Sequence, residues 1–362
     1  MSIAQIKSYI PLGAPAAFAP ASGAASNFSV SLGFEPAWFS QRYEIDFSEK
    51  WHQDPLYRYA CLVKMNEGLK KTFPQVPHFQ TGDDIATLSG AYGAYFFPTV
   101  FGFPLRFAKD RWPLLEPVKP HLTKEEIEKL DAAVLLSAPA VEALFRQMET
   151  IRSEWGEIKG YLNWQGVLNN AFHIRGEAIF TDFYDQPELT HHLLDIICEV
   201  MIKLSQMVQA KQRDSGFAIN QFVVANCTVN MVAPRIYREF IYPYDKRIAE
   251  NFERFGVHTC NWDVTPYLDE LSQLPKMGYL DMGMMSDFTR VKKLFPVTRR
   301  AVFYSPVLLE SASLATIETD LKRIADNMAP CDVIMADVQA STPEERIRDF
   351  LDICARIENG RD

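Results

Sequence analysis

Several features that would place this chain in a common class of protein are missing from its sequence. The longest apolar runs fall short of the ~20 residues that a membrane span needs, and no charged segment followed by an apolar one opens the chain. No run rich in Lys and Arg occurs, and the formal net charge is −9. We therefore expect no membrane and no nucleic acid among its partners.

Common catalytic and cofactor-binding motifs are missing as well. No GxGxxG follows a first strand, which disfavours a Rossmann dinucleotide site, and no Walker loop, GxSxG or HExxH is present. The six cysteines form no CxxC and show no spacing typical of disulfides. In a chain of 362 residues this pattern predicts a reducing, cytoplasmic environment.

The C-terminal part of the chain alternates between short apolar runs and longer amphipathic stretches. The runs at 158–162, 219–225, 256–260, 279–283, 301–304 and 333–336 are predicted strands, and the stretches between them are predicted helices. Such repetition favours an α/β fold, a (β/α)8 barrel of the TIM type, over an open sheet. We assign the barrel to residues 81–362 and an irregular arm with a helical cap to residues 1–80.

One short motif offers metal-binding chemistry. His258 and Cys260 lie two residues apart after the apolar step Phe255-Gly256-Val257, so their side chains point to the same face of a strand. Imidazole nitrogen and thiolate sulfur are donors that zinc prefers. In a barrel the chemistry lies at the carboxyl ends of the strands, and this pair ends one.

The sequence resembles the uroporphyrinogen decarboxylase superfamily over most of residues 36–358. The matching stretches in the C-terminal part include NWQG (163–166), VAPRIYREFIYPYD (232–245), FGVHTC (255–260) and STPEERIRDF (341–350). FSEKWHQDPLYR (47–58), the segment 89–113 and GEAIFTDFYDQPEL (176–189) are similar to the branch of corrinoid-dependent methyltransferases that demethylate methoxylated aromatics. The superfamily fold is a (β/α)8 barrel.

The resemblance implies a zinc site built from His-x-Cys and a later cysteine. His258 and Cys260 match the first two ligands, but the third position falls on Ala336, and the adjacent Asp337 could supply an oxygen as the third ligand. Cys227 could complete the site instead, because it ends the preceding predicted strand, and adjacent strands lie about 4.8 Å apart. Asp263, close behind Cys260, is a candidate partner of His258 or a catalytic acid, and Asp337 is a second candidate for catalysis.

The resemblance also implies a methoxylated aromatic substrate and a methyl-accepting corrinoid. Because nothing in the sequence resembles a cobalamin-binding DxHxxG loop, the corrinoid is expected on a separate protein. The substrate pocket is expected to combine aromatic and apolar walls with a few amides and one acid. The candidate lining residues are Tyr95, Phe96, Asn163, Trp164, Gln165, Asn169, Glu177, Asn226, Met231 and Tyr304.

Two alternatives stay open at this point. One is a metal-free decarboxylase of the same fold, although Arg42 and Arg58 stand apart among aromatic residues and form no Arg-rich segment for substrate carboxylates. The other is a barrel that binds a small molecule without catalysis. The oligomeric state, the methyl donor and the direction of transfer are not determined by the sequence.

Overall fold

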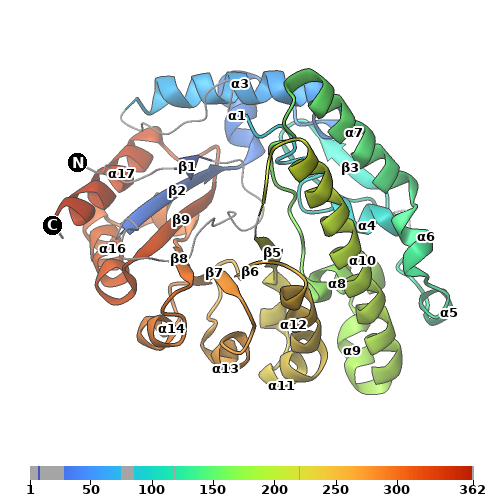
Figure 1. Ribbon diagram of the computed structural model, residues 1–362. Coiled ribbons are helices and arrows are strands. Elements are labelled where there is room, and N and C mark those ends of the chain that lie inside the picture. Colours follow the sequence, from blue (N-terminus) through green and yellow to red (C-terminus); the bar gives the residue numbers. More distant parts are fainter. Residues whose placement is uncertain (1–6, 9–27, 75–84, 118–119, 220, 361–362) are drawn as a thin grey trace.

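The computed structural model describes residues 7–8, 28–74, 85–117, 120–219 and 221–360 (Figure 1). Its main sheet is parallel throughout, with the strand order β1-β2-β9-β8-β7-β6-β5. The strands are β1 (Lys7–Ser8), β2 (Phe28–Phe34), β5 (Phe222–Ala225), β6 (Phe255–His258), β7 (Met277–Gly283), β8 (Arg299–Phe303) and β9 (Cys331–Val338).

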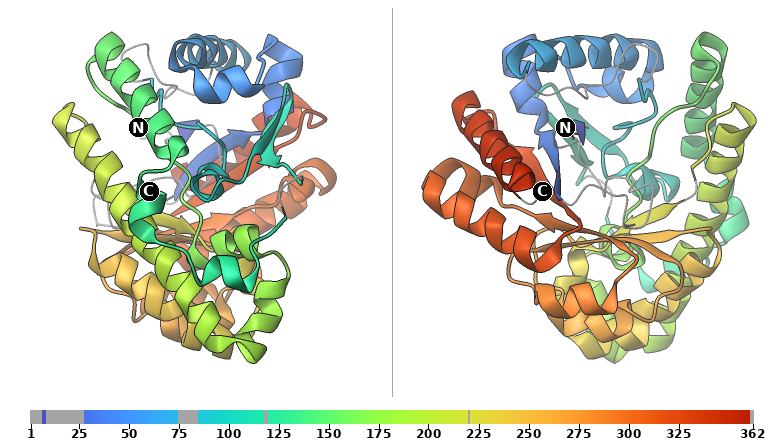
Figure 2. Two further views of the ribbon diagram at one scale, coloured as in Figure 1. Left: turned by 90° about the vertical axis from the view of Figure 1, so that its right-hand side faces the viewer. Right: turned by 60° about the vertical axis from the view of Figure 1, so that its left-hand side comes forward.

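The sheet curls into an arc, and helices follow its outer side (Figures 1 and 2). The helices of this layer are α8 (Val167–Arg175), α9 (Ala178–Asp185), α10 (Pro187–Asp214), α11 (Pro234–Ile236), α12 (Tyr242–Glu250), α13 (Leu268–Leu271), α14 (Phe288–Leu294), α15 (Pro306–Ser311), α16 (Leu314–Met328) and α17 (Glu344–Asn359). Short helical turns η2 (Cys227–Met231), η3 (Tyr237–Ile241) and η4 (Thr265–Tyr267) join them. Strands with helices packed outside them confirm the predicted α/β class.

An eightfold closed barrel is not seen in the described part of the chain. The run at 158–162, which was predicted as a strand, forms no ladder with another strand among the described residues. Beyond it, a single isolated bridge joins Gln165 to Ala225 of β5. On its other side, this segment is joined to the turns around residue 88 by a backbone hydrogen bond from the Leu88 amide to the Lys159 carbonyl. The left-handed backbone at Gly160 and the turns around residue 88 interrupt regular pairing at this edge.

The segment before residue 80 contributes more to the sheet than the sequence indicated. Strand β2 lies between β1 and β9, so residues 28–34 belong to the main sheet rather than to an irregular arm. The rest of the arm, residues 9–27, lies outside the described residues. Beyond β2, the predicted helical cap is present as α1 (Pro36–Tyr43), α2 (Glu49–Gln53) and α3 (Pro55–Thr72). Asp54 accepts hydrogen bonds from the amides of Leu56 and Tyr57 and so caps the start of α3.

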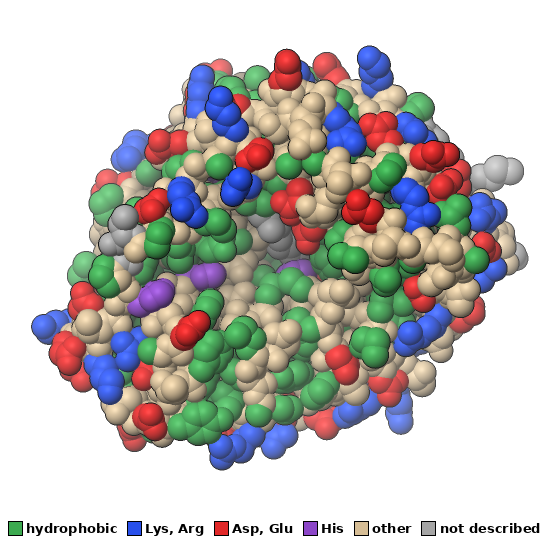
Figure 3. All heavy atoms as spheres, turned by 180° about the vertical axis from the view of Figure 1, so that it is seen from behind, with side chains coloured by type: hydrophobic (Ala, Val, Ile, Leu, Met, Phe, Trp, Pro, Cys, Tyr) green, Lys and Arg blue, Asp and Glu red, His purple; other side chains and the backbone are tan. Residues whose placement is uncertain are grey.

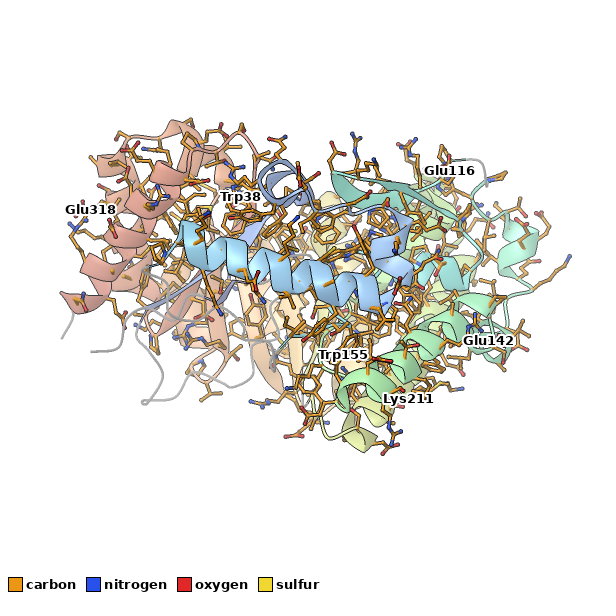
Figure 4. All side chains as sticks on the ribbon, turned by 90° about the horizontal axis from the view of Figure 1, so that it is seen from above. Trp38, Glu116, Glu142, Trp155, Lys211 and Glu318 are labelled. Atoms are coloured by element: carbon orange, nitrogen blue, oxygen red, sulfur yellow. The ribbon has the colours of Figure 1, made fainter. Side chains whose placement is uncertain are left out.

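The cap is held to the rest of the molecule by aromatic packing and one buried arginine. Trp155, at the end of α7 (Pro139–Trp155), stacks on Tyr59 of α3 with ring centroids 4.4 Å apart (Figure 4). Arg58 is fully buried and donates to the carbonyls of Trp51 and Thr87 and to the side chain of Gln147. The Arg58 guanidinium therefore stabilises the packing of the cap.

A small antiparallel hairpin, β3 (Leu105–Ala108) and β4 (Arg111–Leu115), completes the layer above the sheet. Helix α4 (Phe96–Val100) precedes this hairpin, and the short helices α5 (Lys124–Ile127) and α6 (Ala132–Leu136) lie between it and α7. Among the described residues, no helix has both the length and the hydropathy that a membrane span requires.

Candidate metal centre and active site

Three metal-binding side chains converge at the carboxyl ends of two neighbouring strands. Ala225 of β5 pairs with His258 of β6, so Cys227 follows one strand where His258 ends the next. The sulfur atoms of Cys227 and Cys260 are 2.8 Å apart, and Nε2 of His258 is 3.0 Å from the Cys260 sulfur. All three ligand atoms lie within 4.8 Å of one another. Of the two proposed third ligands, Cys227 is the one in this cluster.

The donor types of the centre, and their proximity, suit a shared ion. The two sulfurs stand farther apart than the ~2.05 Å of a disulfide, and both cysteines are free. Cys260 has a left-handed backbone conformation, with φ of 59°. Residues other than glycine adopt this conformation rarely, because it costs conformational energy. This turn places its thiol beside His258 immediately after the strand. Two sulfurs and one nitrogen form a donor set that zinc binds, with a fourth position left for substrate.

The imidazole of His258 is oriented by a buried carboxylate. Nδ1 of His258 lies 2.6 Å from Oδ2 of Asp281, which is fully buried on β7. Asp281 also accepts hydrogen bonds from the Thr259 amide and the Tyr279 hydroxyl. Once Nε2 gives up its proton and Nδ1 keeps its own, the Nε2 lone pair faces the cysteines, as in carboxylate–histidine–zinc arrangements.

The pKa values of the cluster favour an ionised sulfur. The hydrogen bond from Cys260 lowers the pKa of Cys227 to about 5 against the effect of burial, and the charge of His258 adds to this. The same bond and burial raise the pKa of Cys260. Burial opposes protonation of His258, but Asp281 and the two cysteines outweigh it and hold its pKa well above the usual value. Thiolate is the form of cysteine that binds metal.

Asp263 does not take part in this centre. It is exposed, and its carboxylate accepts the amide hydrogen of Thr265, the first residue of η4. The expectation that Asp263 would support His258 is therefore wrong, and Asp281 has that position. The physical reason is topological: Asp281 comes from the neighbouring strand β7, whereas Asp263 lies in a turn that leads away from the sheet.

A pair of carboxyl groups lies at the ends of β2 and β9, beside the metal cluster. The register of these strands shifts between Leu32 and Phe34, which pair with Met335 and Val338, so β9 contains one extra residue. Asp337 falls in this bulge with a left-handed φ of 57°, and the Glu35 amide donates to the Val338 carbonyl.

These two carboxyl groups share a hydrogen bond and affect each other's ionisation. Burial, followed by the charge of Asp337, raises the pKa of Glu35 to about 7. Burial also raises the pKa of Asp337, although the nearby charge of His258 opposes this. Glu35 was missed by the sequence analysis. Its signal was that it directly follows a strand, but that strand was read as part of the arm.

The predicted amides form a chain that leads to the cysteine end of the centre. The Gln165 amide donates to Asn163, and Asn169 donates to Gln165. The side-chain oxygen of Asn169 then accepts the amide hydrogen of Thr228, next to Cys227. Asn226 is buried and donates instead to Asp245, in the structural layer beneath.

The predicted aromatic residues fall into different places. Trp164 and Phe96 are buried, and Trp164 packs on Phe222. Tyr95 lies close enough to Cys227 for the charge of that sulfur to add to burial in raising the pKa of its phenol. Tyr304 is directed outward, where its hydroxyl donates to Asp320 of α16 and its ring packs near Phe350 of α17. The Tyr304 side chain therefore does not face the metal cluster.

Two further candidates lie at the surface. Met231, at the end of η2, is 62% exposed, and Glu177, at the start of α9, is also exposed. Met231 belongs to the outer rim around the strand ends. Glu177 lies beside the aromatic residues of α8.

Comparisons with known proteins agree with this architecture. The profile of the family Uroporphyrinogen decarboxylase (URO-D) matches residues 85–357. A solved structure of a methyltransferase from Methanosarcina mazei superposes with a TM-score of 0.64 at 15% identity, covering 92% of this chain and 94% of that one. Among curated proteins no match was found. The superfamily resemblance found in the sequence is confirmed, and at this identity the solved structure supports the fold alone.

Proposed function

The chain belongs to the uroporphyrinogen decarboxylase family, and we propose that this member is a zinc-dependent methyltransferase. In this proposal it removes the methyl group from a methoxylated aromatic and passes it to the cobalt of a separate corrinoid protein. The observation that carries the proposal is the convergence of Cys227, His258 and Cys260 at one barrel rim. A decarboxylase needs no such cluster of two thiols and an imidazole.

The residues present fit zinc by their chemistry. His258, Cys260 and Cys227 would hold the ion, and Asp281 would fix the tautomer of His258. When bound, zinc supplies a Lewis acid for the ether oxygen, which makes phenolate a better leaving group. A single histidine and two cysteines leave one coordination position open.

In this proposal the Glu35–Asp337 pair supplies a proton to the departing ether oxygen. When the C–O bond of the ether breaks, the departing oxygen carries the electron pair and gains from a proton. Glu35 and Asp337 are hydrogen-bonded and largely buried, so the pair retains a proton more readily than free carboxyls do. We assign Asp337 to this role rather than to the metal.

Exposed apolar side chains around the strand ends support docking of a partner protein. Met231 follows β5, Met285 follows β7 and Val307 follows β8, and these residues are 62%, 79% and 69% exposed. Exposed apolar side chains that form one contiguous patch would suit an interaction surface. A corrinoid protein would have to approach here to bring its cofactor to the metal.

The decarboxylase alternative has less support. Arg58 is buried against backbone carbonyls, and Arg42 pairs with Glu344 and the Ala340 carbonyl. Neither guanidinium is free at the strand ends to grip a carboxylated substrate.

Metal analysis and turnover together test the proposal. We expect about one zinc per chain in the wild type, and loss of both zinc and demethylation in His258→Ala and Cys260→Ser. Cys227→Ser should also lose zinc, whereas Asp337→Asn should retain zinc and demethylate more slowly. Cys61→Ser, which changes a buried cysteine of α3, is the matched control and should keep both. Full turnover by either His258→Ala or Cys260→Ser would refute the metal role.

A further inference from the structure

A pocket of about 580 Å³ lies beside the metal centre, between α8 and the hairpin strand β4. Its volume is in the range of small-molecule sites. The polar and aromatic residues that line it are Tyr95, His121, Phe172, His173 and Glu177. Figure 3 shows a face of the molecule on which histidine and hydrophobic side chains gather around a central hollow.

The walls of this pocket are flat rings and aliphatic groups. The Tyr95 and His173 rings lie 4.9 Å apart, and Phe172 lies 6.1 Å from His173. Two leucines at the end of β4 form the facing wall. Gly176 has a φ of +69°, and a Cβ there would lie 2.6 Å from Nδ1 of His121, so the glycine permits this close approach. These flat and aliphatic walls suit contact with an aromatic ring.

Tyr95 connects the pocket to the metal cluster. Its ring forms part of the pocket wall, and its phenol is influenced by the charge on Cys227. Asn169 and the Phe172–His173 pair lie on the same helix, α8, and Asn169 is hydrogen-bonded to the residue after Cys227. Tyr95 and helix α8 are therefore shared between the pocket wall and the surroundings of Cys227.

The charge of the pocket distinguishes between possible substrates. Burial, together with His121, lowers the pKa of His173 to about 4, so this imidazole is neutral near pH 7. Glu177 is exposed and carries the one carboxylate among the described lining residues, which include no Lys or Arg. A substrate carboxylate would meet like charge without a cation to balance it. A phenolic hydroxyl can donate to Glu177 or share a hydrogen with an imidazole.

We propose that this pocket selects an uncharged methoxyphenol over a methoxylated benzoate, with Glu177 as the residue that sets the preference. The inference rests on the proposed function for the identity of the methyl donor. Its test uses binding alone, so it does not depend on methyl transfer.

The test is calorimetric titration of the zinc-loaded full chain with 2-methoxyphenol and with 4-hydroxy-3-methoxybenzoate. We expect 2-methoxyphenol to bind at least tenfold more tightly. Glu177→Gln should reduce the ratio of the two affinities. Glu177→Lys should reverse the preference, because it gives the benzoate a cationic partner. Glu188→Gln, an exposed glutamate at the start of α10, is the matched control and should leave the ratio unchanged. Phe172→Ala should weaken both ligands.

The outcomes separate the two proposals. Equal or tighter binding of the benzoate by the wild type would overturn the substrate preference, as would a ratio that Glu177→Lys leaves unchanged. Binding of 2-methoxyphenol with the expected preference, but without any methyl transfer, would support the pocket and count against the methyltransferase. Unfolding temperatures of each variant show whether a lost ligand reflects a lost fold.

Discussion

At the scale of single residues, the carboxylate that orients His258 is set by strand pairing rather than by nearness to His258 in the sequence. Asp263 is three residues from Cys260, yet it caps a turn, whereas Asp281 is 23 residues from His258 and lies 2.6 Å from its ring. Strand pairing brings the latter residue to the site. Sequence proximity therefore pointed to the wrong partner for the histidine.

This contrast gives a prediction for metal affinity. Asp281→Asn should weaken zinc binding by roughly 10–100-fold, since it removes the charge that orients His258 and supports its basicity. Asp263→Asn should leave the affinity unchanged. Competition with a zinc-binding dye would measure both constants. Equal losses in the two variants would show that Asp281 has no special role.

At the scale of elements, the cap is joined to the hairpin through a buried histidine. His52 of α2 stacks on Phe107 of β3 with centroids 5.2 Å apart, and its Nδ1 accepts the Tyr92 amide hydrogen. Burial, followed by the charge of Arg58, lowers the pKa of His52 to about 3. The folded protein therefore keeps this ring neutral where the unfolded chain, with a pKa near 6.5, takes up a proton.

The sign of the pH effect follows from this difference. The unfolded state binds the extra proton below pH ~6.5, so stability falls as the pH drops from there toward 3. At pH 5 the cost is about 2 kcal/mol for this one residue. His52→Gln removes it, so the stability advantage of the wild type over the variant should shrink by about that amount between pH 8 and pH 5. Urea denaturation at the two pH values measures it; a constant difference would contradict the prediction.

Apolar periodicity predicted three central strands, and their observed boundaries differ from the predicted ones by up to two residues. Strands β6, β7 and β8 occur at the expected apolar runs, because a strand buried in a parallel sheet reads as a continuous apolar segment. The run at 158–162 contains Lys159 and Gly160, and it is not paired in a ladder in the part of the chain that the structure describes. Strand β2 was missed in part because its run follows an Ala- and Ser-rich stretch.

At the scale of the whole molecule, the curled sheet collects the ends of its strands at one rim. The metal donors, the carboxyl pair and the exposed apolar residues all follow strand ends. Under the proposed function, a small substrate would approach from the pocket beside α8, and the partner protein would dock on the rim.

A charge placed on the rim should separate docking from chemistry. Met285→Glu and Val307→Glu should each raise the KM for the corrinoid protein by about tenfold, equivalent to ~1.4 kcal/mol, because a carboxylate in an apolar contact is desolvated without a partner. Binding of the aromatic substrate and the zinc content should stay unchanged. Val134→Glu, at a residue 69% exposed on α6, is the control. An unchanged KM in both rim variants would exclude this surface as the docking site.

The sequence by itself determined the α/β class and the His258–Cys260 pair, because apolar periodicity and the two-residue repeat of a strand are local properties. The superfamily followed from the resemblance of its motifs to a known family. The tertiary structure alone decided that Cys227 joins them, that Asp281 orients the histidine and that Glu35 meets Asp337 across a bulge. These are contacts between different strands, and they depend on strand order and register, which spacing along a chain does not specify.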